Sequence, residues 1–345
     1  MPITINLKSA VFAVSDALDL VGVSDFQHGK RVAMIARETA LLLGLPEARL
    51  ENLVFAGLLH DMGVSSTAEH RRLVSDDPDV DRQAHCERAF HLMQPFAHLS
   101  LLANAVRHHH TPWTELPVGL GEADAIDSNL ILLADRVDTL LLRHGLENPL
   151  FHSTDICREI SALSGSVLQP DVVDAFLAAA SREAFWISLV PRHVQTYLNE
   201  LELPLWAVTI EFPQFRHVAR LISSIVDAKS HFTASHSLGV AQLSRYLGER
   251  MGFTPDALAK MEIAGLMHDI GKLCVPDEIV EKPARLTVAE FSVMERHSFE
   301  TYQILRHVPG LETVAEWAAF HHEALNGRGY PFRRSAPTLA PEARI

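Results

Sequence analysis

The chain has 345 residues, which is enough for two helical domains, and its 48% hydrophobic and 21% charged content is typical of a folded globular protein. Its formal charge of −13 at pH 7 argues against a broad basic face for long nucleic acid, and the lack of any run of about 20 apolar residues argues against a membrane span. The cysteines stand singly at Cys86, Cys157 and Cys274, which favours a reducing compartment and predicts a cytoplasmic protein.

The predicted elements are helices from one end of the chain to the other. After His28, apolar residues recur at three- and four-residue intervals, as at Val32 and Ile35, and segment 44–46 predicts the end of that helix and the start of the next. Further helices are expected from about 139 to 230, with interruptions near 202–204 and 212–213. The helix after His236 repeats the first pattern and ends near 252–255. Long alternating runs of Val, Ile and Thr are missing from the sequence, so we predict an all-α fold.

The chain's 20 histidines, roughly two to three times average usage, divide it into two copies of one pattern. Each copy has a single His, an adjacent His-Asp 32 residues later, another single His, and a His-His pair 24 residues after that. The members in the first copy are His28, His60, Asp61, His85, His109 and His110. The members in the second copy are His236, His268, Asp269, His297, His321 and His322. We therefore predict two domains, residues 1–205 and 206–345.

Five imidazoles and one carboxylate per copy are more ligands than a single ion takes. An isolated histidine is usually a core or surface residue, but this cluster suits two divalent ions of iron, manganese or zinc, and it contains no thiol. The Asp of the adjacent His-Asp pair would bridge the ions. Two ions so placed would stabilise the attacking and leaving oxygens of a phosphodiester displacement, so the pattern predicts phosphodiester hydrolysis.

Three motifs of the second copy resemble the HD-GYP family. They are HDIGK at 268–272, HSFETYQIL at 297–305 and HHEALNGRGYP at 321–331. The resemblance implies two helical HD-type domains in tandem and a phosphodiesterase that hydrolyses cyclic-di-GMP to linear pGpG or GMP. It also implies two divalent ions per competent site, with iron expected first and manganese or zinc as alternatives.

The resemblance assigns roles by position. The six histidine and aspartate members of the second copy would be metal ligands, with Asp269 bridging the ions and acting in catalysis with Lys272. Lys272 would also contact a substrate phosphate, and Arg328, Gly329 and Tyr330 would contact the substrate. The loop that ends at Pro331 would serve as a contact for a signalling-protein partner. The alternatives are a solvated lysine at 272 and a solvated arginine at 328.

The first copy is predicted to be degenerate. Asp135 in LLADRVDTLL completes its metal ligands, but Val64 stands where the lysine is expected, and no GYP loop follows His109-His110. This copy would bind metal and have a structural or regulatory role. In the second copy, Phe232 replaces the Glu of trinuclear family members, which favours two ions, and the family's last Asp ligand would lie beyond Ile345, so we expect a truncated second domain.

Two other functions remain open at this point. One is a non-enzymatic signalling module that binds metal or nucleotide, which the degenerate first copy favours. The other is a different nucleotide phosphohydrolase of the HD superfamily, which the segment HHEALNGRGYP argues against.

Overall fold

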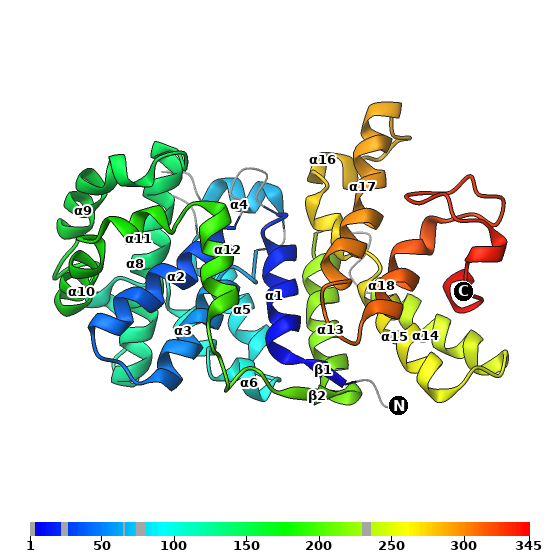
Figure 1. Cartoon of the computed structure of the whole chain (residues 1–345), viewed down its shortest axis with the longest axis horizontal. Coiled ribbons are helices and arrows are strands. Elements are labelled where there is room, and N and C mark those ends of the chain that lie inside the picture. The colour runs from blue at the N-terminus through cyan, green and yellow to red at the C-terminus, as the bar shows by residue number, and fades with distance from the viewer. Residues whose placement is uncertain (1–3, 22–26, 65, 74–80, 230–235) are drawn as a thin grey trace. The chain divides into compact units, whose positions relative to one another are not determined.

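The structure is a computed structural model that describes residues 4–21, 27–64, 66–73, 81–229 and 236–345. Helices dominate these residues (Figure 1). Their two strands, β1 (Thr4–Asn6) and β2 (Thr209–Glu211), pair antiparallel with Ile5 opposite Ile210. The predicted all-α class is confirmed. None of the described helices combines the length and the apolar character that crossing a bilayer would need.

The chain forms two compact units, and each is discontinuous in sequence. The first-copy unit contains residues 24–63 and 72–206, and the second-copy unit contains residues 1–23, 64–71 and 207–345. The chain therefore passes from one unit to the other at Trp206 and Ala207. It also crosses earlier, because the described residues of 1–23 and 64–71 fold with the second copy.

The described residues of the first-copy unit are mainly helical. Its main helices are α2 (His28–Leu42), α3 (Glu47–Leu59), α5 (Gln83–Met93), α6 (Ala97–Ser100), α7 (Ala103–Arg107), α8 (Glu122–His144), α9 (Ser153–Ser161), α10 (Pro170–Ala180), α11 (Glu183–Ile187) and α12 (Pro191–Glu200). Gly44 follows α2 with a φ of +70°, a backbone conformation that favours glycine and ends the helix. Proline is the first residue of α10 and of α12, where its missing N–H leaves no hydrogen bond unmade.

The second-copy unit contains the remaining main elements. They are α1 (Leu7–Leu18), α13 (Phe212–Asp227), α14 (His236–Arg250), α15 (Pro255–Met267), η3 (Ile270–Cys274), α16 (Asp277–Val280), α17 (Val288–Leu305), α18 (Glu312–Ala319) and η4 (Phe320–His322). The short α4 (Thr67–Leu73) begins in this unit. Thr287 and Glu290 form a capping box that begins α17. α1 contacts α17 and η3, and Val14 of α1 and Phe215 of α13 line the same small apolar cavity. α1 and α13 both contribute buried apolar residues to the core of this unit.

The same helix crossing occurs in both units. A Cβ atom on Gly57 of α3 would lie 2.6 Å from the Cα of Ala33 on α2, and one on Gly265 of α15 would lie 2.7 Å from the Cα of Ala241 on α14. Each pair of helices can pack this closely only because glycine lacks a side chain. The crossing brings the histidine that begins one helix close to the histidine that follows the other.

Candidate metal centres

A second glycine in each copy sets the position of the His-Asp pair. A Cβ atom on Gly63 would lie 2.0 Å from the carbonyl oxygen of His85, and one on Gly271 would lie 2.0 Å from that of His297. The turn after the His-Asp pair is thus pressed against the helix that carries the third histidine, α5 or α17. This contact explains why the sequence reads His-Asp-x-Gly in both copies.

In the first copy, predicted ligands converge on the Asp61 carboxylate. The Nε2 atoms of His85 and His60 lie 3.3 and 3.4 Å from its oxygens. Nε2 of His28 lies 3.7 Å from Asp61 and 3.5 Å from Asp135. The His-His pair is at the same centre, with His109 Nε2 3.9 Å from Asp61 and His110 Nδ1 3.9 Å from Asp135. All seven predicted residues of this copy are therefore brought together.

In the second copy, four imidazoles surround the Asp269 carboxylate. Their Nε2 atoms lie 3.1 Å from it for His268, 3.6 Å for His297, 3.7 Å for His321 and 3.9 Å for His236. The fifth imidazole, on His322, groups with those of His297 and His321. The six predicted ligands of the second copy also meet.

Backbone carbonyls hold five of the ten predicted imidazole ligands in one orientation. His60 Nδ1 donates to Gly57 at 2.8 Å and His109 Nδ1 donates to Val106 at 2.6 Å. In the second copy His268, His297 and His321 make such bonds to Gly265, Met294 and Ala318, whereas Nδ1 of His85, the counterpart of His297, has no partner among the described residues. Because Nδ1 carries the proton in the five held rings, each of their Nε2 atoms has a lone pair that faces the central carboxylate, as a metal-binding imidazole requires.

Two observations indicate that these residues fit divalent ions: the distances between the ring nitrogens, and a carboxylate oxygen that has no hydrogen-bond partner. The Nε2 atoms of His28 and His60 lie 3.1 Å apart, and those of His297 and His321 lie 3.2 Å apart. These separations match two ligands of one ion at about 2.0–2.1 Å each. Asp269 Oδ1 is buried and has no hydrogen-bond partner among the described residues, which leaves an anionic oxygen that a cation would satisfy. The groups fall into two sets per copy, consistent with two ions.

In the metal-free chain the pKa values of His28 and His268 are raised, whereas electrostatics favour the metal-binding protonation states of the central carboxylates and of His322. Burial would raise the pKa of the Asp269 carboxyl, but His268 and Lys272 outweigh it and hold that pKa well below its usual range. His60 and His85 have the same effect on the pKa of Asp61. Burial lowers the pKa of His322 to about 4. Ionised carboxylates beside neutral imidazoles are the forms that bind divalent metals.

The two copies differ around these shared ligands. Lys272 Nζ lies 2.5 Å from Asp269 Oδ2, whereas Val64, at the matching position of the first copy, is buried and apolar. His28 donates from Nδ1 to Asp138 at 2.7 Å, and Asp138 also pairs with buried Arg31. Burial opposes a charged ring, yet the Asp138 hydrogen bond raises the pKa of His28 to about 10.

The sequence interpretation missed one group at the first centre, the Cys86 thiol. Its Sγ lies 3.6 Å from His85 Nε2 and 3.5 Å from His109 Nδ1, so the ligand cluster does contain a sulfur atom. Ser298 occupies the same place in the second copy, with Oγ 3.2 Å from His297 Nε2. Burial raises the Cys86 pKa. Its position directly after the third histidine in the repeat was the available signal.

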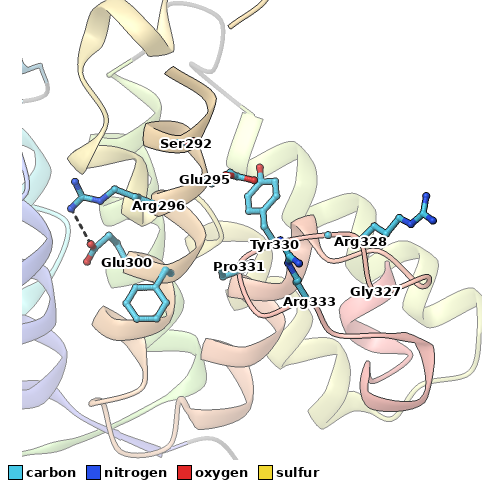
Figure 2. A pocket seen from close by; sticks show the side chains of 11 residues that line it. Ser292, Glu295, Arg296, Glu300, Gly327, Arg328, Tyr330, Pro331 and Arg333 are labelled. Carbon is cyan, nitrogen blue, oxygen red and sulfur yellow. Dashed lines mark hydrogen bonds and ion pairs between the residues drawn. The ribbon is translucent and has the colours of Figure 1, made fainter. Parts of the chain in front are cut away.

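The predicted GYP loop lies against the second centre. The ring of Tyr330 stacks on His322 with centroids 4.7 Å apart and planes at 23°. A Cβ atom on Gly329 would lie 2.4 Å from the His322 carbonyl oxygen, so this glycine allows the loop to approach the His-His pair. Arg328 is exposed at the rim of a hollow beside Tyr330 (Figure 2). Phe232, on which the dinuclear prediction rests, lies outside the described residues.

Comparison with known proteins agrees with the duplicated pattern. Models described as HD domains match residues 25–140 and 220–345. The 3′3′-cGAMP-specific phosphodiesterase 1 of Vibrio cholerae is 36% identical over 334 residues, covering 95% of this chain and 77% of that protein. The 3′3′-cGAMP-specific phosphodiesterase 3 of Vibrio cholerae is 24% identical, and the alignment covers 95% of this chain and 81% of that protein. A cyclic di-GMP phosphodiesterase of Pseudomonas aeruginosa is 34% identical over 38% of this chain and 32% of its own length.

A solved structure shares the fold. The crystal structure of a cyclic GMP-AMP-specific phosphodiesterase of Vibrio cholerae superposes with a TM-score of 0.71 at 22% identity. The match covers 99% of this chain and 96% of that one.

Proposed function

Since the chain belongs to the HD-domain family, with two HD domains in tandem, we propose that it is a metal-dependent phosphodiesterase that hydrolyses a cyclic dinucleotide. One observation carries this proposal. Asp269 is buried, lies within 3.9 Å of four imidazoles, and has Lys272 at 2.5 Å. Such a centre combines a cation site with an ammonium group, which suits an anionic phosphodiester.

The residues of the second copy would have three separate roles: metal binding, phosphate binding and contact with the rest of the substrate. Asp269 and the five histidines would hold divalent ions, which supply Lewis acidity and lower the pKa of water at such centres. Lys272 would exchange its bond to Asp269 for a phosphate oxygen once cations neutralise the carboxylate. Tyr330 and Arg328 would contact the substrate from the loop side. Iron is the metal we expect first, with manganese or zinc as alternatives.

For the substrate, 3′3′-cGAMP is the first candidate and cyclic-di-GMP the second. The two relatives that align with 95% of this chain are named for 3′3′-cGAMP, whereas the cyclic di-GMP phosphodiesterase above aligns with 38%. The tandem arrangement therefore supports the hybrid dinucleotide over the cyclic-di-GMP that the motifs alone predict.

For the first copy we propose a metal-binding, regulatory or structural role. Its ligands are complete, but Val64 leaves it without the lysine. The predicted contact between the GYP loop and a signalling protein also remains a proposal.

The test combines metal analysis with a hydrolysis assay. The purified chain is loaded anaerobically with Fe²⁺, or with Mn²⁺ or Zn²⁺, and the products from 3′3′-cGAMP and cyclic-di-GMP are separated by chromatography. Asp269→Ala should lose metal and reduce turnover by more than about 100-fold, because no neutral neighbour can replace the shared carboxylate. The matched variant Asp61→Ala should lose metal from the first copy and retain turnover.

Two results would contradict the proposal. Bound metal without turnover of either dinucleotide would favour the non-enzymatic signalling module. Undiminished turnover by Asp269→Ala would remove this centre from the reaction.

A further inference from the structure

A hollow of about 570 Å³ lies between α17 and the loop 327–333 (Figure 2). One stripe of α17 lines it, including Ser292, Glu295 and Phe299, which are spaced so that they share a helix face. The opposite wall is the loop, with Tyr330 and Arg328. The volume lies within the roughly 300–1,000 Å³ of small-molecule sites.

Tyr330 separates this hollow from the second metal centre. Its ring lines the hollow and at the same time stacks on His322, a predicted metal ligand. The edge of the Tyr330 ring meets Phe291 with centroids 5.9 Å apart, so the ring is held between α17 and the His-His pair. A ligand whose phosphate reached the metal centre could therefore place a neighbouring group in the hollow.

The charges that line the hollow are of two kinds. Arg296 and Glu300 pair with each other at 3.4 Å. The side chains of Glu295, Arg328 and Arg333 have no ion-pair partner among the residues that the structure describes. Figure 2 shows the Glu295 carboxylate beside the hydroxyl end of Tyr330. Burial, together with the negative charge of Glu295, raises the pKa of Tyr330 to about 12. The hollow thus offers the Glu295 carboxylate next to Tyr330, while the Arg328 side chain begins at its rim and extends away from Tyr330 (Figure 2).

We propose that this hollow binds a guanine nucleoside of the cyclic dinucleotide and that Glu295 is the residue that selects guanine over adenine. The inference rests on the proposed function and deepens it. A carboxylate only accepts hydrogen bonds. Guanine presents two adjacent donors, N1–H and the N2 amino group, whereas adenine presents the acceptor N1 beside its N6 amino group. Adenine would therefore leave the Glu295 carboxylate facing a lone pair.

The other side chains suit the rest of such a ligand. Tyr330 offers an aromatic surface for a purine ring. Arg328 and Arg333 supply positive charge for the phosphates, and arginine binds phosphate oxygens through paired N–H donors. A dinucleotide with guanine in this hollow and one phosphodiester at Asp269 would occupy the hollow and the metal centre of the second-copy unit at the same time.

The test compares substrates that differ only in their bases. The metal-loaded chain is assayed for kcat/KM with 3′3′-cGAMP, cyclic-di-GMP and cyclic-di-AMP. We expect the wild type to prefer the guanine-containing substrates. Glu295→Gln should lower that preference at least about tenfold, since glutamine can pair with either base. Glu316→Gln removes an exposed charge from the same unit outside the hollow, and it should leave the preference unchanged.

A binding measurement separates this inference from the proposed function. Calorimetry with GMP and with AMP as probes should show tighter binding of GMP by the wild type and a reduced difference for Glu295→Gln. If no dinucleotide is hydrolysed but GMP is still preferred through Glu295, the proposed function fails and the base site stands. The inference would be overturned if Glu295→Gln kept the wild-type preference for guanine over adenine both in kcat/KM and in nucleotide binding.

Discussion

Gly271 allows the second metal centre to form, because a side chain there would meet the backbone of α17. Its added Cβ would lie 2.0 Å from the His297 carbonyl oxygen, and α17 would have to move away with its histidine. We expect Gly271→Ala to lower the free energy of unfolding by about 1–3 kcal/mol or more and to weaken metal binding. Urea denaturation and metal titration measure both quantities.

The matched control for this substitution is Gly239→Ala in α14. An added Cβ there meets nothing within 4 Å, and alanine suits a helix interior better than glycine. The free energy of unfolding should rise by about 0.5–1 kcal/mol. If the two alanine variants had the same free energy of unfolding and bound metal equally well, the close approach at Gly271 would have no structural importance.

Buried imidazoles should make the metal-free protein sensitive to acid. Burial lowers the pKa of His110 to about 4, while an unfolded histidine titrates near its ordinary value of 6.5. Between these values the unfolded chain binds more protons, so the stabilisation is complete above pH 6.5 and falls as the pH drops toward 4. His28, whose pKa is raised to about 10, remains protonated in both states over most of this range.

The measurement is urea unfolding of the chelator-treated protein at pH 7 and at pH 5. His110→Gln removes one of the titrating rings, so the loss of stability between the two pH values should become smaller. If the wild type and His110→Gln lost the same free energy of unfolding between pH 7 and pH 5, other groups would be the cause of the acid sensitivity.

At the scale of elements, a buried ion pair joins α2 to α8. Arg31 and Asp138 are both fully buried, and Asp138 also accepts the hydrogen bond from His28. Asp138→Ala would remove the Asp138 carboxylate from the buried Arg31 guanidinium group, so we expect a loss of about 3–5 kcal/mol in unfolding free energy. We also expect weaker metal binding in the first copy, because His28 loses the bond that orients its ring.

The control for this pair is an exposed one. Asp155 and Arg158 pair at 2.8 Å on the surface of α9, and Asp155→Ala should change the unfolding free energy by no more than about 1 kcal/mol. If Asp138→Ala were as mild as this control, the pair between α2 and α8 would not stabilise the unit.

Much of the element pattern was predictable because it is local. Helical periodicity and glycine–proline turns predict the helices, and equal histidine spacing in the two copies predicts two HD domains in tandem, which the family matches confirm. The spacing also indicated which histidines would meet. It carried no information about Asp138, because Asp138 acts behind a metal ligand. For Cys86 the only signal was its position directly after the third histidine of the repeat.

At the scale of the whole molecule, the N-terminal helix α1 stabilises the second-copy unit. Val14 is buried and lines a small apolar cavity together with Phe215, Met267 and Leu305. Val14→Asp would place a charge there, which costs several kcal/mol when no partner is available. Hydrogen exchange should then become faster in residues 207–345 and stay unchanged in residues 28–59.

Val14→Ala is the graded comparison, since it only removes methyl groups and should cost about 1–2 kcal/mol in the same unit. Faster exchange confined to the first-copy unit would contradict this role of α1. Sequence periodicity could not have assigned α1 to the second copy, because an amphipathic helix packs equally well on any complementary apolar surface.

The pairing of β1 with β2, and the packing of α1 on α17 and η3 beside a small cavity shared with α13, also has a consequence during translation. Residues 4–18 leave the ribosome while their partners, from 209 onward, have yet to be made. At about 5–20 residues per second, the apolar face of α1 waits roughly ten to forty seconds before its native partners exist. Nascent chains halted within that interval should therefore recruit chaperones to this helix, and release of the completed chain should end the association.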